Sequence, residues 1–307
     1  MDDPKLSGVI TPLLTPFNAD GSIATRLYTA HAARCLADGS SFLSPFGTTG
    51  EAASVPVAAR TKALEELVSK NAARPDQLIP GTGLTSLADT VALTRLALAV
   101  GARAVMILPP YFYRDAEDEG LYRYMAQLIE DVGSDHLRII LYNIPQNTGL
   151  GFSPALTRRL SLDYPGIIAG YKDSSGQWGH TVQILRAAPG LAIFPGSESF
   201  LPQAMAAGGA GCISASCNVN LPAIRALYDA LLEGSDGEAK DLSLEVNHVR
   251  KALASAGLIT ASKAIIATRT NEPDWRRCLP PLRDAPAELT PALAAIAEGQ
   301  RSAISAT

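Results

Sequence analysis

Eight short apolar segments, each followed by a stretch with helical periodicity, constrain the fold of this chain more than any other feature. The middle segments are apolar at consecutive positions, as parallel strands buried on both faces are. Eight such strand–helix units favour a TIM barrel over a doubly wound sheet, and no GxGxxG sequence opens a helix. The apolar segments begin at Ser7, Ser41, Gln77, Ala102, Leu137, Gly166, Leu191 and Ala210.

The division of the chain follows from where these units end. The eighth helix is expected over residues 221–233, and a polar, glycine-containing segment, residues 233–241, is the expected break. Beyond it, the periodicity predicts helices over residues 242–255, 259–268 and 291–298. The sequence therefore predicts an α/β protein, with a (β/α)8 barrel over residues 1–233 that carries the active site. A small all-helical C-terminal domain is expected over residues 234–307.

Charge and composition exclude several classes of partner. The formal net charge is -4 and the isoelectric point is about 5.6, which argues against binding to nucleic acid or an anionic membrane. No apolar run is long enough for a spanning helix, and the sequence MDDPKLSG lacks a signal-peptide pattern, so a cytoplasmic protein is expected. The four cysteines have no CxxC spacing, and the four histidines have no HxH or HExxH spacing. We therefore expect no metal site.

Lys172 is the first candidate for catalysis, because catalytic residues of a TIM barrel lie at the carboxyl ends of its strands. It ends the apolar segment GIIAGYKDSS, where burial disfavours an ammonium and favours the neutral amine that attacks a carbonyl. A lysine that extends out of the barrel mouth, or one paired with Asp173, explains the same pattern. Lys263, in TASKAIIA, also has apolar neighbours and is expected on a helix surface.

Three further motifs follow predicted strands. In GTTGE two glycines bracket Thr48 and Thr49, which suits either an anion nest for one carboxylate or a tight turn with a threonine cap. Tyr142, in ILYNIPQNTG, can relay protons or can be a structural tyrosine held by one hydrogen bond. The turn PGSE, which contains Gly196, is on its own only weak evidence of a functional site. Since the chain has neither a GxSxG elbow nor a Walker A sequence, elimination favours an amine nucleophile without a metal.

Taken together, GTTGE, YNIPQNTG, GYKDSSG, PGSE and GCISAS resemble the dihydrodipicolinate synthase / N-acetylneuraminate lyase superfamily of Schiff-base-forming lyases, in order and in spacing, over the whole barrel. The resemblance implies that Lys172, Tyr142 and Thr48 are the catalytic residues. Lys172 would form the Schiff base, and Tyr142 would shuttle protons. It also implies covalent binding of pyruvate or another 2-oxo acid, no cofactor, and a homo-oligomer, either a tetramer or a dimer. The implied substrate-binding residues are Thr48, Thr49, Asn147, Ser174, Gly196 and Ile213.

Two positions depart from the synthase pattern. Where synthases carry an arginine in S-R-T-G that grips the distal carboxylate of aspartate semialdehyde, this chain has Asn147, which cannot replace a guanidinium. Where synthases carry a tyrosine that reaches into a neighbouring subunit's relay, this chain has Phe112, which has no proton to pass. The pattern looks more like 4-hydroxy-2-oxoglutarate aldolases and 2-keto-3-deoxy acid lyases.

The expected function is therefore a carbon–carbon lyase, or aldolase, that joins pyruvate to an aldehyde or cleaves the product, a hydroxylated 2-oxo acid. The enzymatic alternatives are 4-hydroxy-tetrahydrodipicolinate synthase and a 2-keto-3-deoxy sugar-acid dehydratase, which would use the same Schiff base. A 2-oxo-acid-binding protein without turnover is the alternative from another class.

Overall fold

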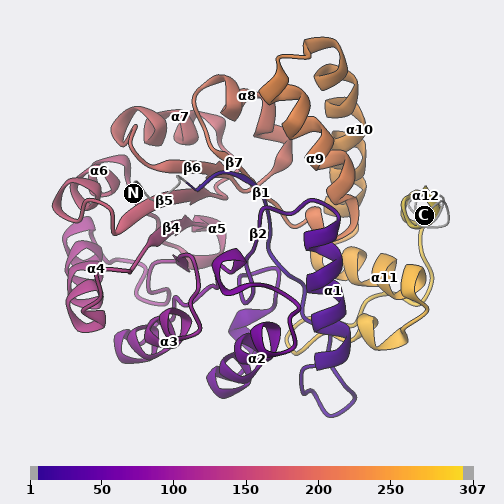
Figure 1. The fold of residues 1–307 in the computed structure, drawn as a ribbon, viewed down its shortest axis with the longest axis horizontal. Coiled ribbons are helices and arrows are strands. Elements are labelled where there is room, and N and C mark those ends of the chain that lie inside the picture. Colours follow the sequence, from indigo (N-terminus) through magenta and orange to yellow (C-terminus); the bar gives the residue numbers. More distant parts are fainter. Residues whose placement is uncertain (1–5, 300–307) are drawn as a thin grey trace.

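The computed structural model describes residues 6–299, in which parallel strands form a central ring and helices surround it (Figure 1). The strands are β1 Gly8–Thr11, β2 Phe42–Leu43, β3 Val105–Ile107, β4 Ile139–Asn143, β5 Ile168–Asp173, β6 Ala192–Pro195 and β7 Gly211–Ile213. The helices are α1 Thr25–Ala37, α2 Val57–Ser69, α3 Leu87–Ala99, α4 Asp118–Val132, α5 Pro145–Thr148, α6 Pro154–Asp163, α7 Trp178–Ala187, α8 Leu201–Ala206, α9 Cys217–Glu233, α10 Asp236–Ser255, α11 Leu258–Thr270 and α12 Pro291–Gly299.

Two parallel sheets, in the orders β2–β1–β7 and β3–β4–β5–β6, make up the ring. The backbone N–H of Ala210 donates to Ile193 across 2.9 Å and joins β7 to β6. The predicted third strand is not regular: only isolated parallel bridges from Leu78 to β2 and from Gly81 to β3 close this side. Pro80 lies between them and has no N–H to donate, which interrupts the ladder. The prediction of a TIM barrel is confirmed.

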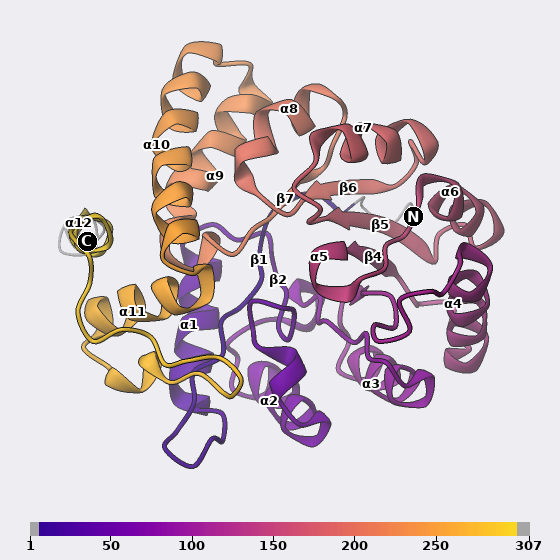
Figure 2. The same cartoon turned by 180° about the vertical axis from the view of Figure 1, so that it is seen from behind.

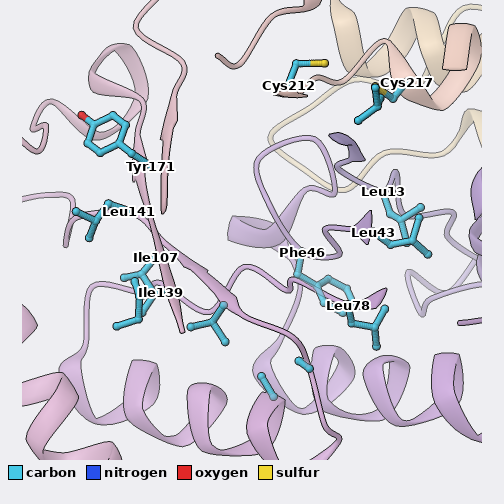
Figure 3. Close-up of a cluster of buried hydrophobic side chains, with 14 of the residues drawn as sticks. Leu13, Leu43, Phe46, Leu78, Ile107, Ile139, Leu141, Tyr171, Cys212 and Cys217 are labelled. Atoms are coloured by element: carbon cyan, nitrogen blue, oxygen red, sulfur yellow. The ribbon is translucent and has the colours of Figure 1, made fainter. Parts of the chain in front are cut away.

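Side chains alternate between the inside of the ring and the helices around it. Successive residues of a strand point to opposite faces, so one buried cluster, which contains Met106, Ile140 and Phe194, consists of strand and loop residues without the surrounding helices. The second cluster joins the outer faces of the strands to the helices. Figure 3 shows members of it on different strands, among them Leu43, Leu141 and Cys212.

On one side of the barrel, α10 lies beside α9 and α11 lies beside α1 (Figures 1 and 2), while α12 contacts α10 and α11. They share a buried cluster with the barrel, in which Leu253 and Ile265 accompany Leu14 and Leu27. None of the helices within residues 6–299 has the length and apolar character of a membrane span. The division at residue 233 stays a prediction.

One expectation for the C-terminal region was wrong. Residues 236–241 were expected in the polar break, but they form the first turns of α10. Asp236 and Glu238 lie in its first turn, where acidic side chains stabilise the positive end of the helix dipole. The break shrinks to Gly234 and Ser235, and Gly234 ends α9 in the left-handed conformation with φ of 73°.

Candidate active site

A cavity of about 270 Å³ opens at the carboxyl ends of the strands. The short helix α5, which directly follows β4, lies at this end and on the near side in Figure 2. Residues of α10 and α11 complete the cavity wall. The structure thus brings together every site residue that the sequence indicates. These are Thr48, Thr49, Tyr142, Asn147, Lys172, Ser174, Gly196 and Ile213.

Lys172 faces the inside of the barrel. In register, it pairs with Tyr142 on β4 and Phe194 on β6, both members of the inner cluster. Only 4% of its surface is exposed, and its Nζ lies 4.1 Å from the centre of the Tyr142 ring. Within residues 6–299 this amine has neither a carboxylate partner nor a hydrogen bond. This burial excludes the alternative of a lysine that extends out of the barrel mouth into solvent.

Asp173 does not pair with Lys172, because the next residue of a strand points to the opposite face. Its carboxylate accepts hydrogen bonds from Asn143, the Ser175 N–H, His180 and Thr181 at 2.7–3.1 Å. Burial on its own would raise the pKa of this carboxyl, but the four hydrogen bonds outweigh burial and lower the pKa to about 2. The acid next to Lys172 in the sequence is therefore satisfied elsewhere.

Tyr142 connects the amine to the loop after β2. It is 3% exposed, and its hydroxyl lies 3.1 Å from Thr48 Oγ1. The ring of Tyr142 thus contacts the buried amine, and its hydroxyl contacts a second hydroxyl. This contact also shows where the Thr48 side chain goes: it meets Tyr142 instead of capping a helix.

The loop over residues 47–51 leaves two backbone donors unused. The N–H groups of Gly50, Glu51 and the following alanine donate within the loop, whereas those of Thr48 and Thr49 have no acceptor within the described part of the chain. Two adjacent free N–H groups form a nest that suits a carboxylate. Gly50 is needed for this shape, since a Cβ there would lie 2.8 Å from the carbonyl oxygen of Leu13.

Lys263 was expected on a helix surface, and this was wrong. Its side chain is fully buried and pairs with Glu51, also fully buried, while the second Glu51 oxygen accepts the Leu279 N–H at 2.8 Å. The Lys263 amine also donates to the Arg277 carbonyl at 2.6 Å. A buried charge is stable when it is paired and hydrogen-bonded. The C-terminal region thereby holds the loop over residues 47–51 in place.

The remaining predicted residues lie on the walls. Gly196 must be glycine, because a Cβ there would lie 2.1 Å from Ser174 Oγ. Ile213 is buried in the inner cluster. Asn147 is exposed on α5 and also lines an adjacent cavity of about 360 Å³. Phe112 is 79% exposed and has a positive φ of 111°, which is strained for a residue with a side chain.

Arg250 is a cavity residue that the sequence did not indicate. It lies on α10, and its Nη1 approaches Ser214 Oγ at 3.2 Å and Glu198 Oε2 at 3.6 Å. Glu198 belongs to the PGSE turn, and its carboxylate is fully buried. No local pattern distinguishes Arg250 from other charged residues of an amphipathic helix, so only the tertiary structure finds it.

The comparisons with known proteins fit this geometry. The model of the dihydrodipicolinate synthetase family matches residues 5–300. The chain belongs to this family. Its members are lyases, and the enzyme is accordingly an aldolase-like carbon–carbon lyase.

The family enzyme has relatives along nearly its full length. It is 32% identical to an uncharacterised DapA-like lyase of Chloroflexus aurantiacus over 91% of this chain and 92% of that protein. It is also 32% identical to a 4-hydroxy-tetrahydrodipicolinate synthase of Thermus thermophilus over 80% of this chain and 81% of that one. The crystal structure of dihydrodipicolinate synthase from Agrobacterium tumefaciens superposes with a TM-score of 0.84 at 30% identity, covering 97% of this chain and 99% of that chain.

The Asp173 network predicts a defined pH dependence of stability. A carboxyl whose pKa falls from 3.8 to about 2 on folding stabilises the fold above about pH 4, and this contribution is lost as the pH falls through 2. Asp173→Asn should therefore lower the free energy of unfolding by about 2 kcal/mol at pH 7 and by roughly half as much at pH 3. Urea unfolding at both pH values measures this, with the exposed Asp135→Asn as the control. An equal loss at both values would contradict the assignment.

Proposed function

We propose that this family enzyme is a class I lyase that holds pyruvate, or the 2-oxo end of a larger acid, as a Schiff base on Lys172. The observation that carries the proposal is the buried Lys172 amine, which has no acidic partner within residues 6–299 and lies 4.1 Å from the centre of the Tyr142 ring. A neutral amine is the form that attacks a carbonyl. The substrate is a hydroxylated 2-oxo acid.

The chemistry follows from this attachment. Lys172 Nζ attacks C2 of the 2-oxo acid, and loss of water gives an iminium that withdraws electrons from C3. Tyr142 takes the proton of the C4 hydroxyl, the C3–C4 bond breaks, and an aldehyde and an enamine result. Protonation of C3 and addition of water to C2 then release pyruvate and the free amine. The reverse sequence joins pyruvate to the aldehyde.

The other residues bind and orient the substrate. The free N–H groups of Thr48 and Thr49 bind the carboxylate next to C2, and the Thr48 hydroxyl, 3.1 Å from the Tyr142 hydroxyl, continues the proton path. Ser174 and Asn147 contact the distal part of the substrate, while Gly196 and Ile213 line the pocket for the pyruvate unit. The proposal includes a homo-oligomer, which the exposed, strained Phe112 supports as a contact residue.

One alternative has a specific observation in its favour. The synthase of Thermus thermophilus is 32% identical to this chain, so 4-hydroxy-tetrahydrodipicolinate synthesis is the second candidate. It would begin with the same Schiff base. Against it stands Asn147, an uncharged residue at the position that the resemblance gives to an arginine.

Chemical trapping tests the covalent step. Incubation with pyruvate and borohydride should attach one reduced pyruvyl group per chain, and peptide mass analysis should locate it on Lys172. Lys172→Met should abolish labelling, whereas Lys251→Met, at an exposed position on α10, should not. A label on another lysine, or none in the wild type, would remove the mechanism.

Substitution of the phenol tests the proton path. Tyr142→Phe keeps an apolar ring and deletes one hydroxyl, so the fold should be retained. If the hydroxyl moves protons, turnover should fall about 10²–10⁴-fold. Tyr124→Phe, which removes a hydroxyl that bonds Thr90 on α3 at 2.8 Å, is the control and should leave turnover within about threefold of wild type. Near-normal turnover in Tyr142→Phe would make this tyrosine a packing residue.

Asn147 tests the choice between cleavage and synthase activity. The wild type should cleave a hydroxylated 2-oxo acid faster than it condenses pyruvate with aspartate semialdehyde. Asn147→Arg should raise the ratio of condensation to cleavage by up to about ten- to a hundred-fold, the value of a charged contact worth about 1.5–3 kcal/mol. Asn147→Gln is the uncharged control. Coupled assays of both reactions measure the ratio, and efficient condensation by the wild type would contradict the aldolase assignment.

A further inference from the structure

A second cationic side chain borders the cavity that contains Lys172. Arg250 reaches it from α10, which lies outside the ring of strands, and 20% of its side chain is exposed. A guanidinium that borders a pocket loses part of its hydration, which is costly unless polar or charged groups replace the water. A ligand that carries a matching negative charge would compensate for this loss.

The contacts of Arg250 hold it in place and leave donors unused. Nη1 is 3.2 Å from Ser214 Oγ, 3.5 Å from Ser216 Oγ and 3.6 Å from Glu198 Oε2. Within residues 6–299, its Nε and Nη2 have no hydrogen-bond acceptor. A guanidinium has five N–H donors, and two of them can bind one carboxylate side by side.

Glu198 fixes the position of the guanidinium rather than saturating it. The carboxylate is fully buried and accepts a hydrogen bond from Ser214, while its Oε1 has no partner within the described residues. Its separation of 3.6 Å from Nη1 is an ion-pair contact, longer than a hydrogen bond. The Nε and Nη2 donors of Arg250 therefore remain for a ligand.

The cavity also separates the two ends of a bound substrate. If Lys172 holds C2, and Thr48 and Thr49 hold the adjacent carboxylate, the chain beyond C3 must occupy the remaining space. Loops after β6 and β7, together with α10 and α11, border that space. Among the charged side chains there, Asp173 faces the outside of the barrel and is saturated, so Arg250 is the charge that the distal end would meet.

We propose that Arg250 binds a carboxylate at the distal end of the substrate, and that the hydroxylated 2-oxo acid is therefore a dicarboxylic acid. This inference rests on the proposed Schiff-base function and adds the substrate class to it. Arg250 reaches the cavity from α10 and Asn147 from α5, so a carboxylate on Arg250 lies at another wall of the cavity than the position that the resemblance gives to the synthase arginine. The aldehyde released by cleavage is then itself an acid.

Two matched substrates test this inference. One is the five-carbon 4-hydroxy-2-oxo acid with a carboxylate at C5, and the other has a hydroxymethyl group there instead. The wild type should prefer the first, and Arg250→Gln should lower kcat/KM for it about ten- to a hundred-fold, mainly through KM, while changing the second by less than about threefold. Arg250→Lys should restore part of the preference. Lys251→Gln makes the same charge change at the next, exposed residue of α10 and should have no effect.

The controls separate misfolding and failure of the mechanism from failure of the inference. Arg250→Gln leaves the buried Glu198 unpaired, so the double variant with Glu198→Gln removes both charges and should show the same loss of preference. Borohydride trapping of pyruvate on Lys172 should persist in every variant. Absence of trapping in the wild type overturns the Schiff-base function itself. Trapping with an equal loss for both substrates, or with no loss for either, overturns the role of Arg250 alone.

Discussion

Alternation of side chains along β5 separates an amine and a carboxylate that are neighbours in the sequence. Lys172 points into the barrel. Asp173 points toward α7, and its carboxylate accepts two hydrogen bonds from that helix and two more from β4 and the loop after β5. The amine is therefore buried beside Tyr142, and within residues 6–299 it has no carboxylate partner. Because the strand is central in its sheet, this separation cannot relax without breaking the ladders to β4 and β6.

A second interaction connects the barrel with the C-terminal helices. Lys263 on α11 and Glu51 in the loop after β2 form a buried ion pair, and Leu279 adds a backbone hydrogen bond to the same carboxylate. The loop contains the N–H groups of Thr48 and Thr49, which have no acceptor among residues 6–299. The helix α10 also contributes to the cavity, which its residue Arg250 lines. The C-terminal helices thus belong to the site and are more than an appendix to the barrel.

The sequence predicts the barrel and the members of the cavity well, because both depend on local patterns: apolar segments define the strands, and motifs such as GTTGE follow them directly. It fails where a partner is distant in the chain. Glu51 is 212 residues from Lys263, and the apolar neighbours of Lys263 do not reveal whether the amine faces solvent. The role of Arg250 is hard to predict for the same reason, since it contacts Ser214, which is 36 residues away and outside α10. At the third strand, Pro80 left only isolated bridges where a regular strand was expected.

A crystal structure of the protein with pyruvate tests the central claim most directly, namely that the Lys172 amine and the loop after β2 form one site for a 2-oxo acid. The account predicts continuous density from Lys172 Nζ to C2 of pyruvate, with the carboxylate within hydrogen-bond distance of the N–H groups of Thr48 and Thr49. Pyruvate bound without a covalent bond to Lys172, or with its carboxylate on Arg250, would contradict this arrangement.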